Sequence, residues 1–207
     1  MATPLDVLTR DLARAIEAQD ADGARNVRRS IVAGHPDAPA AHDAAYRLGL
    51  DALVTERRLD LAAEHFRAAT KARDPQLQQA ARTSLGLALA RLGKPQQATF
   101  ELRKAASAKP ATLANVQALS FIESLAREQK NGAEADRVRA EILKTLDAMR
   151  RAGASEDAAM AELLLGAEAK SEGKRDVARK HLAAALAGGH LPPDARARAE
   201  RLLADVS

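Results

Sequence analysis

The chain has 207 residues, of which 46% are hydrophobic and 29% are charged. Its 32 Lys and Arg residues stand against 28 Asp and Glu residues, and the small net charge of +4 does not indicate a strongly basic surface. Because the chain contains no cysteine, disulfides, thiolate catalysis and cysteine-ligated metals are excluded.

The apolar residues are mostly Ala and Leu, with only one Tyr and three Phe among the aromatics. This composition suits helices that pack at short range, and no alternating run of β-branched residues predicts a strand. No apolar segment approaches the roughly 20 residues that span a bilayer, and the N-terminus lacks the pattern of a signal peptide. We therefore expect an all-α protein of the cytoplasm, without membrane insertion.

The first predicted helical hairpin covers residues 4–37. Thr3 is followed by a proline, which is typical of a helix N-cap and first helical position. Apolar residues recur at three- and four-residue steps from Leu5 to Ile16, as in an amphipathic helix. Since this hairpin has the periodicity of a repeat without its signature residues, we expect it to be a terminal capping unit.

The third predicted hairpin, residues 76–110, shows the repeat unit in its clearest form. A Leu-Gly pair ends at Gly86, and Ala98 and Leu102 mark the facing helix. Since Gly86 and Ala98 have almost no side chain, the two helices can approach closely there, with Leu102 beside the contact. Pro110 cannot continue a helix and closes the unit.

The second predicted hairpin, residues 40–75, repeats the unit with a small difference in length. Its glycine and alanine, Gly49 and Ala62, are 62 − 49 = 13 residues apart, against 98 − 86 = 12 in the third hairpin. We therefore expect one extra residue in the connecting loop of the second hairpin.

The remaining predicted elements are the hairpins 112–151 and 155–189 and a terminal helix over residues 193–206. The last of these hairpins preserves the interval of 178 − 166 = 12 residues between Gly166 and Ala178. The fourth hairpin is degenerate, with Ala126 in place of the glycine.

The spacing Leu-Gly-x2-Leu, then Ala-x3-Leu-x2-Ala, then Pro resembles the tetratricopeptide repeat. The resemblance implies an α-α superhelix, a solenoid of about five helical hairpins plus a C-terminal capping helix, in a single domain over residues 1–207. It also implies that the first helices of the hairpins line a concave groove.

The resemblance places the following residues in that groove: Asp43, Tyr46, Leu50, Ala80, Thr83, Leu87, Glu123, Arg127, Lys130, Met160, Leu163, Ala167 and Lys170. The alternative for the three leucines is that they pack between neighbouring helices. One subset of the family binds acidic chaperone tails through lysine and asparagine on these faces. Here Leu50 and Leu87 stand where asparagine is expected, which argues against that partner.

No arrangement of residues indicates catalysis. The histidines do not form HExxH, and no glycine-rich loop of the phosphate-binding kind is present. His181 and His190 are the only pair whose metal binding is worth testing. We therefore expect no enzymatic activity, no cofactor and no metal.

The cluster Arg25, Arg28 and Arg29 has acidic neighbours and no aromatic stacking platform, so we interpret it as a solvated face and expect no nucleic acid partner. The sequence favours a non-enzymatic adaptor that binds a peptide or helix of another protein in the groove, with Arg127 and Lys130 selecting acidic partners. The alternative is a self-associating scaffold that forms homo-oligomers. An enzyme or a nucleic-acid binder is supported only by generic charges, and the sequence does not name the partner.

Overall fold

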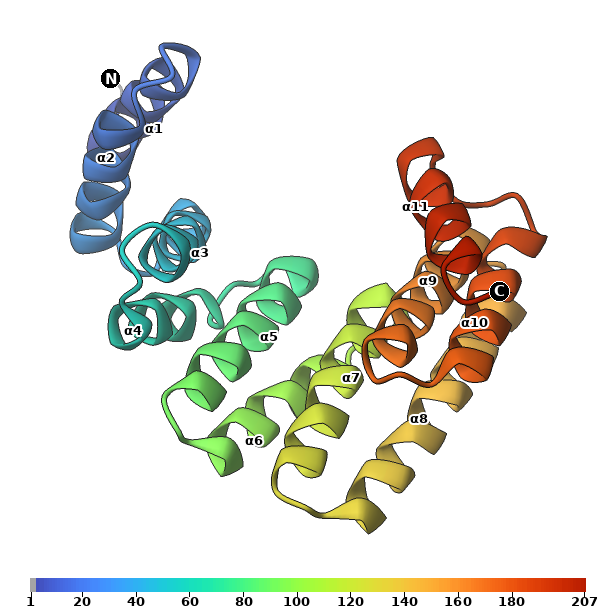
Figure 1. The fold of residues 1–207 in the computed structure, drawn as a ribbon. Coiled ribbons are helices and arrows are strands. Elements are labelled where there is room, and N and C mark those ends of the chain that lie inside the picture. Colours follow the sequence, from blue (N-terminus) through green and yellow to red (C-terminus); the bar gives the residue numbers. More distant parts are fainter. Residues whose placement is uncertain (1–2) are drawn as a thin grey trace. The chain divides into compact units, whose positions relative to one another are not determined.

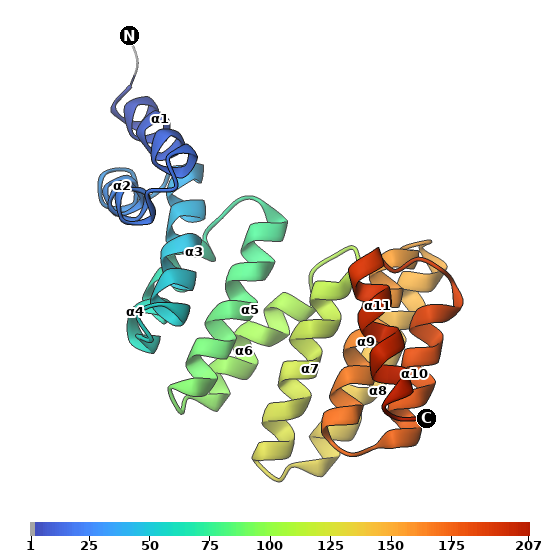
Figure 2. The same ribbon diagram turned by 45° about the horizontal axis from the view of Figure 1, so that its top comes forward.

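A computed structural model describes residues 3–207, and within this range every regular element is an α-helix (Figure 1). The chain divides into two compact units, residues 1–105 and 106–207. Each unit is a series of helical hairpins, and the same helices are seen from a second direction in Figure 2. No helix in the described range is both long and apolar enough to cross a membrane.

The first unit is made of three hairpins. Its helices are α1 (Pro4–Glu17), α2 (Ala21–Gly34), α3 (Pro39–Val54), α4 (Leu59–Ala69), α5 (Pro75–Arg91) and α6 (Pro95–Ala106), whose last residue passes the boundary of the unit. The predicted cap of α1 is confirmed, because the Asp6 backbone N–H donates to Thr3 Oγ1 at 3.2 Å and the Thr3 N–H donates to the Asp6 carboxylate at 2.7 Å. Helices α3 and α5, the first helices of successive hairpins, contact one another.

The close approach predicted at Gly86 is confirmed. A Cβ atom on Gly86 would lie 2.6 Å from Leu102 Cγ and 3.2 Å from the Ala98 carbonyl oxygen. Gly166 has the same relation to Leu182, at 2.7 Å. Since Leu102 and Leu182 are fully buried, they have no free space to move into, and a larger residue at either glycine would separate the two helices.

The loop between α3 and α4 has the extra residue that the sequence predicts. Residues 55–58 connect these helices, whereas residues 92–94 connect α5 and α6. The longer loop contains Arg57 with a left-handed φ of 54°, and the shorter one contains Gly93 with a φ of 72°. In the hairpin of α3 and α4, the ring of Phe66 takes the place that leucine has opposite Gly86 and Gly166, 2.6 Å from a Cβ built on Gly49.

The second unit consists of two hairpins and a final helix. Its helices are α7 (Leu113–Glu128), α8 (Gly132–Arg151), α9 (Ser155–Ser171), α10 (Arg175–Ala187) and α11 (Pro193–Ala204). Helix α11 packs against both α9 and α10, and its Ala199 is buried in one core cluster with Leu163, Leu182 and Leu191. The predicted terminal helix therefore closes the end of this unit.

The five hairpins and the capping helix expected from the sequence are thus confirmed. Their assembly into a single continuous domain stays a prediction.

Candidate interaction surfaces

The predicted groove residues of the first unit lie on two helices that contact one another, α3 and α5. We call the following six residues the first-helix face: Asp43, Tyr46, Leu50, Ala80, Thr83 and Leu87. Asp43 is exposed and the other five are half-buried. The Tyr46 ring also packs on Phe66, with 5.7 Å between the ring centroids. None of the six is fully buried, so this face presents apolar surface beside one carboxylate.

Two predicted groove residues of the second unit are not available to a partner, in contrast to the prediction. Leu163 is only 4% exposed and belongs to the core cluster that α10 and α11 complete. Glu123 is only 3% exposed. Both side chains are covered by neighbouring helices of the same unit, which the spacing of residues along α7 and α9 does not reveal.

The other predicted groove residues of this unit differ in their packing, ion pairs and exposure. Met160 packs against the same core cluster, and Lys170 forms an ion pair with Asp205, just after α11. Ala167 is half-buried. Lys130 is exposed, but it lies in the turn after α7 with a left-handed φ of 58°, not on the helix.

Glu123 is the centre of a closed cluster of charges. It accepts hydrogen bonds from Arg127 Nη2 at 2.7 Å and from Arg127 Nε at 3.1 Å on its own helix. It also accepts from Arg139 Nε on α8 at 3.0 Å. The hydrogen bonds with Glu123 raise the pKa of Arg127. A buried carboxylate that accepts several charge-assisted hydrogen bonds is stabilised where it stands and has little left to offer a partner.

Further carboxylates lie beside this cluster. Burial raises the pKa of Glu168 above its ordinary value of 4.5, and the like charges of Glu123 and Glu172 add to the rise. Glu172 accepts a hydrogen bond from Lys174 at 2.6 Å, which lowers the pKa of Glu172. Glu172 thus has a cationic partner in this part of the second unit, whereas Glu168 is disfavoured in its charged form by burial and by the carboxylates near it.

A pocket opens in the second unit between α8 and α10, and we call it the α8–α10 pocket. Its volume is about 610 Å³. It is lined by Arg127, Arg139, Leu143, Ala169, Lys174, Asp176, Val177, Lys180 and His181. Leu143 and Val177 are 47% and 41% exposed, which is unusual for large apolar side chains in this protein. The lining thus combines apolar side chains with four cations and one carboxylate.

The His181 side chain of this pocket contacts a buried carboxylate of the neighbouring helix α9. Its Nδ1 lies 2.6 Å from Glu162 Oε2, within hydrogen-bond distance. Glu162 is buried and also pairs with Arg150. Sequence reasoning missed this arrangement because Glu162 and His181 lie on different helices. Among residues 3–207, no group of three or more His, Cys, Asp and Glu side chains could hold a metal ion.

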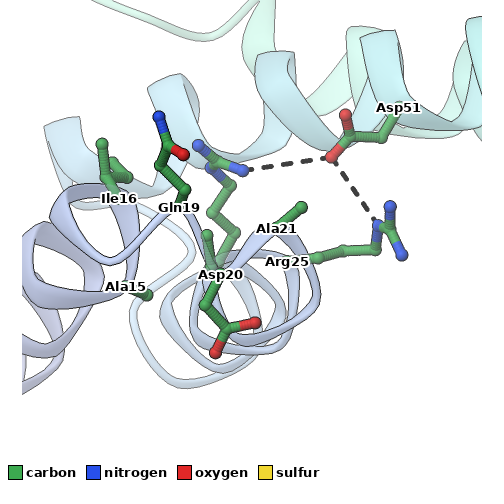
Figure 3. A pocket seen from close by; sticks show the side chains of 9 residues that line it. Ala15, Ile16, Gln19, Asp20, Ala21, Arg25 and Asp51 are labelled. Carbon is green, nitrogen blue, oxygen red and sulfur yellow. Dashed lines mark ion pairs between the residues drawn. The ribbon is translucent and has the colours of Figure 1, made fainter.

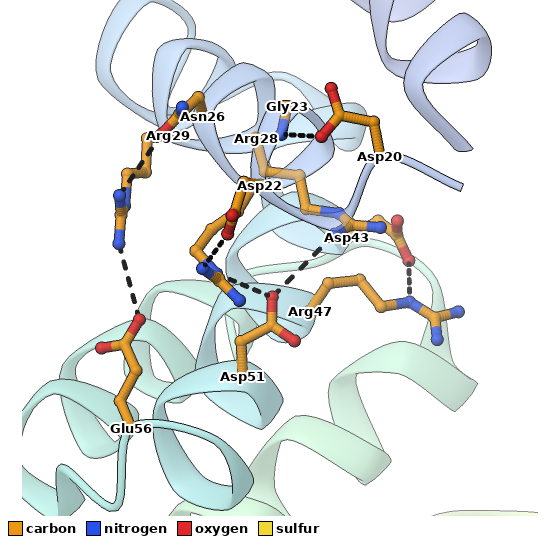
Figure 4. A network of polar contacts seen from close by, with 11 residues as sticks. Asp20, Asp22, Gly23, Asn26, Arg28, Arg29, Asp43, Arg47, Asp51 and Glu56 are labelled. Atoms are coloured by element: carbon orange, nitrogen blue, oxygen red, sulfur yellow. Dashed lines mark hydrogen bonds and ion pairs between the residues drawn. The ribbon is translucent and has the colours of Figure 1, made fainter. Parts of the chain in front are cut away.

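The first unit contains a second network of charges, which joins α2 to α3 and to the loop after α3 (Figure 4). Arg29 pairs with Glu56 at 3.5 Å, and Arg25 and Arg28 both face Asp51. The side chains of Arg25 and Arg28 are only 20% and 18% exposed. The interpretation of this arginine cluster as a solvated face is therefore wrong for these two, although Arg29 is exposed.

These features define a helical-repeat scaffold of the tetratricopeptide type. The chain belongs to the family of the N-terminal domain of the ESX-1 secretion system protein EccA1, of the type VII secretion systems, which matches residues 1–165. No curated protein sequence matches the chain.

Two solved structures are similar to this chain. The crystal structure of PilW, a widely conserved type IV pilus biogenesis factor, is similar over 94% of this chain and 82% of that one, with a TM-score of 0.55 and 16% identity. PilF of Pseudomonas aeruginosa is similar over 97% of both chains, with a TM-score of 0.49 and 16% identity. At 16% identity the likeness to PilW shows the fold alone, and this fold is an α-α superhelix.

Proposed function

We propose that this scaffold is a non-enzymatic adaptor that binds an acidic, amphipathic segment of a partner protein. The α8–α10 pocket is the proposed site. The observation that carries this proposal is the exposure of Leu143 and Val177 in the same lining as the exposed Lys180. Exposed apolar side chains gathered in one place on a folded unit are typical of a partner site.

The two kinds of side chain contribute in different ways. Covering Leu143 and Val177 with an apolar side chain of the partner removes surface from water, at about 25 cal/mol per Å². Lys180 of the lining is exposed, so its charge can meet an acidic residue of the partner. The lining contains no serine, threonine or cysteine, so no nucleophile of these types stands next to His181. This supports binding and not catalysis.

The first-helix face is a second proposed surface for the same function. Leu50 and Leu87 lie half-buried on helices that contact one another, and a peptide or helix laid across them would bury both. The alternative is that these half-buried leucines mediate self-association. Light scattering of the purified chain distinguishes an adaptor from a self-associating scaffold, because a monomer supports the adaptor. A cytoplasmic location is part of this proposal.

A random-peptide display library, selected on the immobilised full chain, tests the proposed site. We expect the selected peptides to combine acidic and large apolar residues. Their affinity should fall at least about tenfold, or 1.4 kcal/mol, in Leu143→Glu and in Lys180→Glu. Val54→Glu is the matched control, because Val54 is an exposed apolar residue of the other unit. Peptides without acidic residues, or equal affinities for all four proteins, would overturn the proposal.

A further inference from the structure

Two pockets of the first unit differ in the balance of their charges. In the pocket between α2 and α3, Arg25 and Arg28 face Asp51 (Figure 3). Asp20 also lines this pocket, and Asp22 accepts a hydrogen bond from Arg25 at 2.8 Å. Because carboxylates match both arginines, this pocket has no excess of positive charge that would attract a ligand. The other pocket is different in this respect.

This other pocket is lined by residues of α4, α5 and α6, and we call it the α4–α6 pocket. Arg67 comes from α4, Leu85 and Leu89 come from α5, and Phe100 and Glu101 are among the four residues from α6. Leu85 and Leu89 are each only 2% exposed, so they form a closed apolar base. The volume is about 310 Å³, at the lower end of the range for ligand pockets, which is roughly 300–1,000 Å³. Such a pocket suits one large apolar side chain.

The ring of Phe100 is held at this pocket although most of it faces water. Phe100 is 58% exposed, whereas Phe66 of the same unit is fully buried. The Lys104 ammonium, one turn further along α6, lies over the ring at 3.9 Å from its centroid, and this contact restrains the ring. Because the ring is already held in one orientation, a partner that contacts it loses less conformational freedom on binding. Exposed aromatic side chains are also frequent anchors in protein interfaces.

The charges at the α4–α6 pocket leave an excess of positive charge. Glu101 accepts a hydrogen bond from Arg82 Nη1 at 2.8 Å, so the carboxylate of the lining is matched by a cation of α5. Arg67 is the other charged residue of the lining, and it is exposed. The exposed Glu64 and Lys71 stand three positions before it and four positions after it. Three cations therefore face two carboxylates, and Arg67 can meet an acidic residue of a partner.

We propose that the α4–α6 pocket is a docking site for a short segment of a protein partner, in which a large apolar residue stands next to an acidic one. The apolar side chain enters the pocket against Phe100, and the acidic side chain pairs with Arg67. This site goes beyond the function proposed for the α8–α10 pocket, because it lies in the other unit and uses different residues. In both pockets the exposed apolar residues belong to the second helices of the hairpins.

Short synthetic peptides test this site in the full chain. Ac-Gly-Phe-Asp-Gly-amide carries the proposed pair of side chains, and Ac-Gly-Phe-Asn-Gly-amide and Ac-Gly-Ala-Asp-Gly-amide each lack one of them. We expect the first peptide to shift the methyl resonances of Leu85 and Leu89 to saturation in NMR titrations. The Asn peptide should bind about threefold more weakly, as expected of a lost exposed ion pair, and the Ala peptide should give no saturable shift. Equal affinities for the three peptides, or no saturable shift with the first, would overturn the proposal.

Variants with matched controls complete the test. Phe100→Gln should abolish the saturable shift, whereas Val54→Gln, which removes another exposed apolar side chain of this unit, should retain it. Arg67→Gln should remove the preference for Asp over Asn, whereas Arg73→Gln, at an exposed arginine outside the lining, should keep that preference. If Phe100→Gln or Arg67→Gln behaves as the original chain does, the α4–α6 pocket is not the proposed site. Leu143→Glu should leave the affinity for the first peptide unchanged, so the two proposed pockets are tested independently.

Discussion

Each unit of this protein holds a carboxylate that faces two arginines, and the two clusters differ in how they are closed. Glu123 of the second unit is buried and accepts hydrogen bonds from both of its arginines at 2.7–3.1 Å. Asp51 of the first unit lies 3.8 and 3.9 Å from its two arginines and accepts from neither. Burying a charge is unfavourable unless its hydrogen bonds are made, so the cluster around Glu123 holds its helices together, whereas the half-buried Asp51 forms only longer ion pairs.

The same contrast extends to the apolar side chains of the first helices. Leu50 and Leu87 of the first unit remain half-buried, whereas Leu163 of the second lies in the core. The second unit instead exposes Leu143 and Val177, on the second helices of its hairpins. One repeat plan thus presents different faces in its two parts, because neighbouring helices cover different positions.

The largest expected effect on stability comes from replacing a buried leucine, Leu163, with glutamate, compared with the same change at the half-buried Leu87. Leu163→Glu should lower the free energy of unfolding by about 4 kcal/mol or more, because it buries an unpaired charge in the core. Leu87→Glu should lower it by less than about 1 kcal/mol, as expected of a partly exposed position. Denaturant unfolding followed by circular dichroism measures both.

The result for Leu87→Glu also tests whether the first-helix face is available to a partner. If this variant loses as much stability as Leu163→Glu, Leu87 is a core residue and cannot belong to a binding surface. If stability is kept, Leu87→Glu should weaken any partner that uses this face.

A second comparison removes the charge from each carboxylate. Glu123→Gln should lower the free energy of unfolding by about 2–3 kcal/mol, because two arginines lose a buried, hydrogen-bonded partner. Asp51→Asn should change it by less than about 1 kcal/mol, since no hydrogen bond is lost. Thermal unfolding of the two variants at one pH measures the difference. Equal losses would show that Asp51 is as structural as Glu123, contrary to the comparison.

The smallest effect concerns pH in the crowded part of the second unit. The pKa of Glu168 is raised in the folded state above 4.5, so the folded protein takes up this proton before the unfolded chain does as the pH falls. Ionised Glu168 therefore destabilises the fold at neutral pH, and this effect fades as the pH is lowered through the folded-state pKa towards 4.5. Glu168→Gln should be slightly more stable than the original chain at pH 7, and the gain should disappear in acid. A gain that is constant across the pH range would contradict this assignment.

The helices could be predicted from the sequence because their signals are local. Thr3 before a proline, the Leu-Gly pair at Gly86 and the extra residue after α3 each describe a few neighbouring positions. The packing partner of Gly86 is also within reach of such reasoning, because a hairpin with a short loop brings Leu102 opposite to it.

The charged clusters could not be predicted, because they join different helices. The acidic residues next to Arg28 in the sequence suggested a solvated face, yet the carboxylate that it faces is Asp51 on the next helix. Likewise Glu123 meets Arg139 of α8 as well as Arg127 of its own helix. Which side chains meet across two packed helices depends on the rotation of each helix about its axis, and no local spacing determines that angle.

The core of the second unit also bears on where this protein can be shortened. The match to the EccA1 family covers residues 1–165, a boundary that falls inside α9 (Ser155–Ser171). A chain cut there would lose Leu182, Leu191, Ala199 and Val206, which share a buried cluster with Leu163. The remaining half of α9 would expose its apolar side to water and invite aggregation. For recombinant expression, the stretch that relatives share is therefore a poor guide, and a soluble fragment should extend through Val206.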